Sequence, residues 1–337
     1  MRFNFIRRFL QASGIVLLIV VVLSSAIWAD LALWYQLPTT EPIRIGACLG
    51  FDLVAVAAAT ALVSRRYRQS LLIYAVTYVV ILIWWASIRP SNDKDWAPEV
   101  AHSLSGSREG DRLSVQNVRN FSWRSEFDFT ERWEQRIYDL SKVQSLDLYL
   151  VYWMGPAIAH TIVSFGFEDG RYLDFSIELR RTRNGEYSAI AGFFKTSELV
   201  YVGADERDLL ILRKVRREDV RLYRLKTPPN QVRALLVEYI NVANDLAAHP
   251  RFYNTLTTNC TTTIFDMVSA VNYSIPFDWR VILTGYLPSY LYERGAVDTD
   301  ISLDALSRRA DVSGRINNGL SEMGFSTVIR DGVPGPR

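Results

Sequence analysis

The stretch AHTIVSFGFEDGRYLDFSIELR, residues 159–180, decides how the soluble part of this chain folds. It holds two runs of aromatic and β-branched residues, which are the residue types favoured in strands, on either side of Glu168-Asp169-Gly170. A short, glycine-containing turn between two such runs predicts a β-hairpin. The length of the turn also decides which side chains meet, because successive side chains of a strand point to opposite faces of the sheet.

The register of this hairpin bears on the position of one histidine. A three-residue turn pairs Phe167 with Arg171 and places His160 opposite Glu178 on the same face. A two-residue turn would instead put Leu179 opposite His160 and point Glu178 away. Glu178 is therefore expected to lie beside His160 only if the turn has three residues.

Further strands are predicted around the hairpin, and helices after it. The apolar spacing becomes helical over 230–247, where a Pro-Pro pair precedes the segment and His249-Pro250 follows it. A second helix is expected from Cys260 to about Val271. Strands first and helices last predict an α+β domain. The other predicted strands lie at 112–124, 145–153, 198–204 and 221–225.

Three apolar segments precede this domain, and each qualifies as a membrane span, which needs roughly 20 residues as a helix. A cleaved signal peptide is the competing interpretation of the first segment, but two further spans and the bulky Trp28 near the would-be cleavage site favour an uncleaved anchor. We therefore divide the chain into a membrane anchor, 1–89, and a soluble domain, 90–337. The predicted transmembrane helices are Phe9–Trp34, Ile45–Val63 and Leu71–Ile88.

Arginines indicate which way the anchor faces. They precede the first span and fill the turn between the second and third, and such residues favour the cytoplasmic side. The N-terminus is then cytoplasmic and the domain after Arg89 is periplasmic, which predicts a multi-pass protein of the bacterial inner membrane. The arginines concerned are Arg2, Arg7, Arg8, Arg65, Arg66 and Arg68.

Charge and cysteine content narrow the function. The formal net charge is +2 with both signs scattered, so a nucleic-acid partner is not expected. The two cysteines, Cys48 and Cys260, are far apart, and Cys48 lies in an apolar run, so neither a disulfide framework nor a CxxC metal site is supported. No cofactor or metal is expected, because a lone thiol lacks the ligand spacing of a zinc site.

The stretch TLTTNCTTTIFDMV, residues 255–268, places Cys260 at the start of a helix, directly after Asn259, a good N-cap residue. Backbone N–H groups in a first turn are unsatisfied and the helix dipole there is positive, so the thiolate is favoured and its pKa falls below about 8.5. The same N–H groups could hold an oxyanion during acyl transfer. Cys260 is therefore a candidate nucleophile.

A cysteine nucleophile needs a base and a group that orients the base. His102 lies in a Ser/Gly-rich stretch and His249 precedes a proline at a helix end, whereas His160 begins a strand in an apolar setting. We choose His160 as the general base, with Glu178 as the conditional orienting residue and Ser176 as a weaker candidate. The competing interpretation is a buried cysteine that fills space and a histidine with a purely structural role.

Six segments together resemble the Lnb N-terminal periplasmic domain family of bacterial membrane proteins. The resemblance implies a circularly permuted papain-like, NlpC-type fold in which the histidine strand precedes the cysteine helix, an order shared with lecithin retinol acyltransferases. It also implies a Cys-His enzyme acting on lipid acyl groups, with family members linked to lipoprotein N-acylation. Carried onto this chain, Cys260 is the acyl-accepting nucleophile, His160 the base and Glu178 a candidate orienting residue. The segments are PSNDKDW (90–96), NVRNF (117–121), GPAIAHTIVSFGF (155–167), FSIELR (175–180), ADERDLLILR (204–213) and YNTLTTNCTTTIFD (253–266).

These features predict a membrane-anchored periplasmic acyltransferase or thiol hydrolase that acts on lipid acyl esters through a thioester. Its expected partner is a membrane phospholipid or a lipoprotein. Two alternatives stay open: a cell-wall peptide hydrolase with the same Cys-His pair, and a non-catalytic envelope protein that binds a partner.

Overall fold

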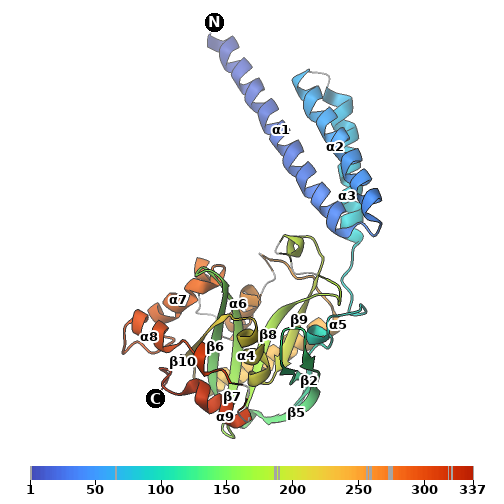
Figure 1. Cartoon of the computed structure of the whole chain (residues 1–337). Coiled ribbons are helices and arrows are strands. Elements are labelled where there is room, and N and C mark those ends of the chain that lie inside the picture. Colours follow the sequence, from blue (N-terminus) through green and yellow to red (C-terminus); the bar gives the residue numbers. More distant parts are fainter. Residues whose placement is uncertain are drawn as a thin grey trace. The chain divides into compact units, whose positions relative to one another are not determined.

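The computed structural model describes residues 2–64, 67–185, 188, 190–255, 257, 260–271, 276–317, 319 and 322–336 (Figure 1). The chain divides into two units. One comprises Met1–Pro90 together with Ser188–Thr196, and the other comprises Ser91–Tyr187 together with Ser197–Arg337.

The first unit contains three helices, α1 (Arg2–Gln36), α2 (Glu41–Val63) and α3 (Tyr67–Ser87). Each is long and apolar enough to cross a membrane, which confirms the three predicted spans. Most of their large apolar side chains are exposed, as expected of surfaces that face lipid. Where the helices contact one another, small and aromatic residues are buried, among them Ala29, Ala58 and Phe51.

The short segment Ser188–Thr196 belongs to the unit of the three helices, which the sequence did not indicate. The Phe194 ring stacks on Tyr35, with 5.5 Å between centroids, and meets Trp85 edge-on at 6.2 Å. The Gln36 side-chain amide donates to the Phe194 carbonyl over 2.6 Å, and Lys195 Nζ donates to the Trp85 carbonyl over 2.7 Å. These contacts join the segment to the ends of α1 and α3.

The second unit is built on one sheet of eight strands in the order β1-β2-β9-β8-β7-β6-β10, with β5 paired to β2. β2 and β9 are parallel where they pair, and the other neighbours are antiparallel. The strands are β1 (Ser105–Glu109), β2 (Arg112–Arg119), β5 (Trp133–Asp139), β6 (Val143–Met154), β7 (Ile158–Phe167), β8 (Tyr172–Arg180), β9 (Glu198–Ala204) and β10 (Asp219–Leu225). A separate two-stranded sheet is formed by β3 (Ser122–Trp123) and β4 (Phe129–Thr130).

The predicted hairpin is β7–β8, and it has the three-residue turn. The Phe167 N–H donates to the Arg171 carbonyl over 3.0 Å, and Gly170 takes a φ of 80°, a conformation that glycine adopts without a Cβ penalty. The ladder extends to the pair Ile162–Ser176. His160 and Glu178 lie two residues beyond that pair in the same register, and their side chains share a face.

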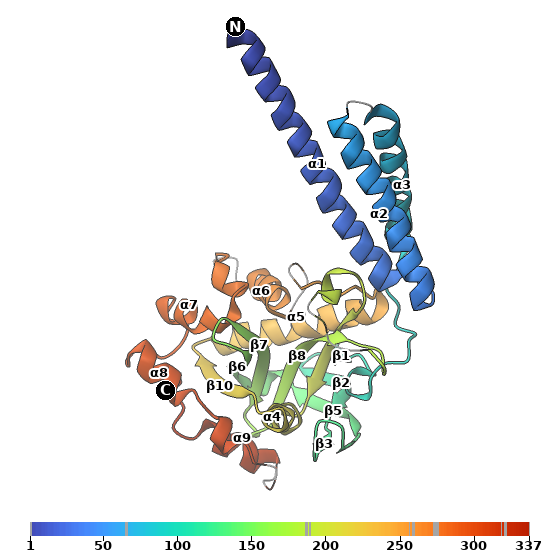
Figure 2. The same ribbon diagram turned by 45° about the horizontal axis from the view of Figure 1, so that its top comes forward.

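Helices cover both faces of the sheet (Figure 2). One face packs against α5 (Pro229–Ala248), α6 (Cys260–Val271), α7 (Leu287–Glu293) and α8 (Leu303–Arg309), and the other against α4 (Glu206–Val215) and α9 (Glu322–Arg330). Each face has its own apolar core, since side chains of a strand alternate between them. The short 3₁₀ helices are η1 (Pro98–Val100), η2 (Leu140–Lys142), η3 (Ala191–Phe193), η4 (Trp279–Val281), η5 (Thr284–Tyr286) and η6 (Ser313–Arg315).

The predicted order of strands first and helices last is wrong at α4, which lies between β9 and β10. Asp205 caps this helix by accepting a hydrogen bond from the Arg207 N–H over 3.0 Å. All four residues of the run 209–212 are buried, so the amphipathic spacing that reveals a surface helix is absent there. The predicted strand 112–124 is also divided, because β2 ends at Arg119 and β3 begins at Ser122.

A buried ionic network fastens the C-terminal helix to the sheet. Arg330 of α9 donates through Nε to Asp147 over 2.7 Å and through Nη2 to Glu206 over 2.6 Å. Glu206 also accepts from the Tyr149 hydroxyl over 2.6 Å. Asp174 of β8 is buried beside this network, and burial together with the charge of Glu206 raises its pKa well above the ordinary value.

Candidate active site

Cys260 is the first residue of α6, the position that the sequence predicted for it. Its proposed N-cap, Asn259, lies outside the described residues. The thiol is free and half-buried against the core that α6 shares with the sheet. Beside it, the Thr261 hydroxyl lies 3.6 Å from Sγ and 3.3 Å from the Thr161 hydroxyl of β7, so the start of the helix is held against that strand.

His160 lies near the start of β7, and its side chain is 14% exposed. The His160 ring and the Cys260 thiol are neighbours, and each shifts the pKa of the other. His160 Nε2 lies 2.7 Å from Ser176 Oγ and 3.4 Å from Glu178 Oε1. The structure therefore brings Cys260, His160 and Glu178 together, with the Ser176 hydroxyl as the nearest neighbour of Nε2.

Ser176 and Glu178 form the far side of the site. The Ser176 hydroxyl donates to Glu178 Oε1 over 2.7 Å, so its oxygen accepts from the His160 Nε2–H. These two side chains reach the same region because they are two residues apart on β8 and so share a face. Ser176, the weaker candidate of the sequence analysis, thus lies between the His160 ring and the Glu178 carboxylate.

Arg213 is a further member of the site that the sequence analysis missed. It comes from α4, is buried, and donates through Nη2 to Glu178 Oε1 over 2.8 Å. Its Nη1 lies 3.6 Å from Glu218. Arg213 lies in the segment ADERDLLILR, which is one of the segments that carry the family resemblance. No helix was predicted there, so Arg213 could not be placed.

The electrostatics of the site favour a thiolate beside an imidazolium. Burial lowers the pKa of His160, but the Glu178 carboxylate and the hydrogen bond with Cys260 outweigh it and raise the pKa to about 9. Burial raises the pKa of the Cys260 thiol, yet the hydrogen bond and charge of His160 leave it below its ordinary value. Burial also opposes ionisation of Glu178, but His160 and Arg213 hold its pKa well below the usual range.

The other two histidines have partners elsewhere. The ring of His102 meets Trp133 edge-on, with 5.0 Å between centroids. His249 Nδ1 lies 3.0 Å from Asp245 Oδ1 at the end of α5. His160 is the histidine that lies beside Cys260 in the candidate site.

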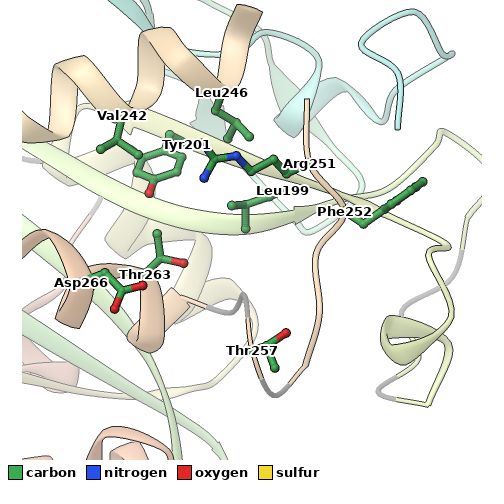
Figure 3. Close-up of a pocket in the computed structure, with 9 residues that line it drawn as sticks. All are labelled: Leu199, Tyr201, Val242, Leu246, Arg251, Phe252, Thr257, Thr263 and Asp266. Atoms are coloured by element: carbon green, nitrogen blue, oxygen red, sulfur yellow. The ribbon is translucent and has the colours of Figure 1, made fainter. Parts of the chain in front are cut away.

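A cavity of about 200 Å³ lies on another flank of α6 (Figure 3). Thr263 and Asp266 of α6 line it, opposite Leu199 and Tyr201 of β9. Neither Cys260 nor His160 is among its lining residues. The cavity therefore adds no group to the candidate site.

These observations define an α+β domain, carried by membrane-spanning helices, in which a strand bearing histidine precedes a helix that begins with cysteine. Residues 129–285 match the family model of the Lnb N-terminal periplasmic domain. The match includes Cys260, His160, Glu178 and Arg213. The protein is therefore membrane-associated and has a periplasmic domain. No curated protein and no solved structure matches the chain.

Proposed function

We propose that this protein is a membrane-anchored, periplasmic thiol acyltransferase or hydrolase that acts on lipid acyl esters through a thioester on Cys260. The observation that carries the proposal is the pairing of Cys260 with His160, in which the pKa of the thiol is lowered and the pKa of the imidazole is raised. This is the arrangement that a cysteine nucleophile needs at neutral pH.

In the first step, the Cys260 thiolate attacks the carbonyl carbon of a lipid ester. A sulfur–carbon bond forms, and the negative charge moves to the carbonyl oxygen, where the positive end of the α6 dipole can stabilise it. As the intermediate collapses, the carbon–oxygen bond breaks and the His160 imidazolium gives its proton to the departing alcohol. The products are an acyl thioester on Cys260, a free alcohol and a neutral imidazole.

In the second step, an amine or a water molecule attacks the thioester. Neutral His160 takes the proton of the attacking group, the new carbon–nitrogen or carbon–oxygen bond forms, and the Cys260 thiolate leaves. An amine acceptor gives an N-acyl product, as lipoprotein N-acylation would require, and water gives a free fatty acid. Both routes return the site to its starting ionic pair.

The helices suit this chemistry because a domain tethered at a bilayer meets an insoluble substrate at a raised effective concentration. The arginines before the first span and between the second and third favour a cytoplasmic N-terminus and a periplasmic domain at the inner membrane. A periplasm-dependent reporter fused after Arg337 should be active. Activity of a cytoplasm-dependent reporter at that position would contradict this topology.

The thioester is the direct test. The full-length protein, purified from growing cells, is expected to carry a hydroxylamine-sensitive fatty-acyl adduct on Cys260, detectable by mass spectrometry. Cys260→Ala and His160→Ala should both lack it, whereas Cys48→Ala, the matched control at the other cysteine, should keep it. An adduct on Cys48 alone, or none on any variant, would refute the thioester route.

The same variants separate the alternatives. A cell-wall peptide hydrolase would release muropeptides from peptidoglycan in a reaction that Cys260→Ala abolishes. A non-catalytic binding protein would keep full complementing activity in that variant. An acyltransferase or lipid hydrolase would lose complementation and leave muropeptides unchanged.

A further inference from the structure

An exposed apolar surface lies at one end of the second unit. It is formed by the end of β6 and by the segment that contains η4 and η5. Seven large apolar side chains, each at least 37% exposed, make up what we call the tip patch: Trp153, Met154, Phe277, Trp279, Ile282, Leu283 and Tyr286. Exposed groups of this kind are unusual in soluble domains and mark interaction surfaces.

The two parts of the tip patch form one surface. The Trp279 and Tyr286 rings lie 5.6 Å apart between centroids, and Tyr286 lines the same groove as Trp153. The Gly285 N–H donates to the Ala157 carbonyl over 3.0 Å, which joins η5 to the β6–β7 hairpin. The backbone thus holds these side chains in one place.

The groove, of about 620 Å³, adds positive charge beside the aromatic rings. It is lined by three arginines as well as by Glu218 and Asp219. Arg216 donates to Glu126 over 2.9 Å, and Arg221 donates to Asp219 over 2.9 Å. Arg217 is exposed, and within the described part of the chain no acidic side chain lies in ion-pair range of its guanidinium.

The tip patch adjoins the candidate active site. The Thr284 hydroxyl accepts from the Ala159 N–H over 2.8 Å and donates to the Ala159 carbonyl over 2.5 Å. Ala159 directly precedes His160 in β7. A ligand held at the patch would therefore lie beside the strand that carries the candidate base.

The covalent links to the membrane-spanning unit leave from the same end of the sheet. β6 ends and β7 begins there, and β9 begins there too, at Glu198. The chain enters the second unit at Ser91 and again at Ser197. The Ser91 N–H donates to Glu198 Oε1 over 3.2 Å, which places the first entry point at the start of β9.

We propose that the tip patch is a membrane-docking surface, with its apolar side chains among the lipid acyl chains and Arg217 at the lipid phosphates. Trp and Tyr favour the boundary between headgroups and acyl chains, and exposed arginine is attracted to anionic lipid. Because the chain is anchored by its own helices, the second unit meets a bilayer at a raised effective concentration. The docking of the tip patch on a membrane does not depend on the proposed function. Only the role of that docking in delivering an acyl ester to Cys260 rests on the proposed function.

Photocrosslinking tests the docking in the full-length protein. We place p-benzoylphenylalanine at Ile282, which is 42% exposed, and as a control at Ile137 of β5, which is 43% exposed. In nanodiscs of phosphatidylethanolamine and phosphatidylglycerol, illumination should give phospholipid adducts at 282 several-fold above those at 137. Arg217→Gln should lower the yield at 282.

Three results would overturn the proposal. Adducts at 282 to the chain's own helices would show that the protein itself covers the patch. Adducts to a second copy would show an oligomer contact. A lipid yield at 282 no higher than at 137 would show that the surface stays in water.

An activity assay separates this proposal from the proposed function. In the double variant Ile282→Asp with Leu283→Asp, the ratio of Cys260 acylation from bilayer phospholipid to acylation from a soluble short-chain ester should fall at least tenfold. An unchanged ratio would contradict a role in substrate delivery. If neither donor acylates Cys260 in the parent protein, the proposed function fails, while the adducts at Ile282 still decide the docking.

Discussion

Arg213 donates to the same carboxylate oxygen of Glu178 that faces His160, so the acid of the candidate site is shared between a guanidinium and an imidazole. Glu178 and Arg213 carry opposite charges and shift the pKa of His160 in opposite directions. The Glu178 charge raises the pKa of the ring, whereas the Arg213 charge lowers it. Arg213 is thus a positioning residue, because it acts on the ring through Glu178, and this opposition yields two predictions of opposite sign.

Glu178→Gln should move the alkaline limb of the pH profile to lower pH. In the parent protein, activity should fall above a pH of about 9, as His160 loses its proton and the thiolate loses its partner. Without the carboxylate charge the imidazolium loses its main support, so the limb should shift towards the ordinary histidine value of about 6.5. The measurement is the rate of Cys260 acylation by a soluble ester against pH. Superimposable profiles would exclude an electrostatic role for Glu178.

Arg213→Met should shift the same limb in the opposite direction, to higher pH, because the guanidinium no longer opposes the charge on His160. Arg213→Lys keeps the charge and should leave the limb near its parent position, which makes it the control. Removing one partner of a buried ion pair is costly, about 3–5 kcal/mol in typical cases, so thermal unfolding must first show that each variant is folded. A downward shift in Arg213→Met would contradict the assignment.

Ser176→Ala should slow acylation at pH 7 by about five- to tenfold, the loss of one hydrogen bond worth roughly 1 kcal/mol. Glu178 Oε1 is already 3.4 Å from His160 Nε2, so it can take over part of the contact. The alkaline limb should stay close to that of the parent, because the charge of the carboxylate is kept. A shift of the alkaline limb as large as that expected for Glu178→Gln would mean that the Ser176 hydroxyl is essential for the effect of Glu178 on the pKa of His160.

Asp174→Asn should stabilise the soluble domain. The native pKa of this carboxyl is raised, so its contribution to stability is complete below the unfolded value of about 3.8 and is lost as pH rises through the native pKa. Asparagine does not ionise, so the variant should not lose stability in this way as the pH rises. The melting temperature should rise by about 2–4 °C per kcal/mol gained, and the gain should grow between pH 4 and pH 7. Equal melting temperatures across that range would refute the interpretation.

Glu206→Gln is the matched contrast within the same network. Glu206 holds Arg330 through Oε1, at 2.6 Å, and its pKa is lowered by that charge despite burial. The amide would leave the buried guanidinium with less compensation, so the melting temperature should fall. Opposite signs for Asp174→Asn and Glu206→Gln are the result that supports this account.

The parts of the structure that follow local rules could be predicted from the sequence. The composition of the turn at 168–170 predicted the hairpin but left two registers open, and the structure has the three-residue turn that places Glu178 near His160. The length of the apolar runs gave the three spans, and apolar periodicity gave α5.

The rest depends on long-range packing that no local pattern reports. All residues of the run 209–212 are buried, so their apolar pattern fits a strand as well as a helix. Without a predicted helix there, the sequence analysis could not place Arg213 in the site. The position of Ser176 between ring and carboxylate depends on side-chain conformation. The tip patch is formed only when the segment that contains η5 meets the β6–β7 hairpin.

The attachment of Ser188–Thr196 to the membrane helices has a practical consequence for anyone who expresses this domain alone. A fragment that begins at Ser91 would retain the segment but discard Tyr35 and Trp85, which cover the Phe194 ring. The orphaned aromatic surface would then favour self-association of the fragment. A recombinant version should therefore keep all three helices in detergent, or replace the segment with a short polar linker.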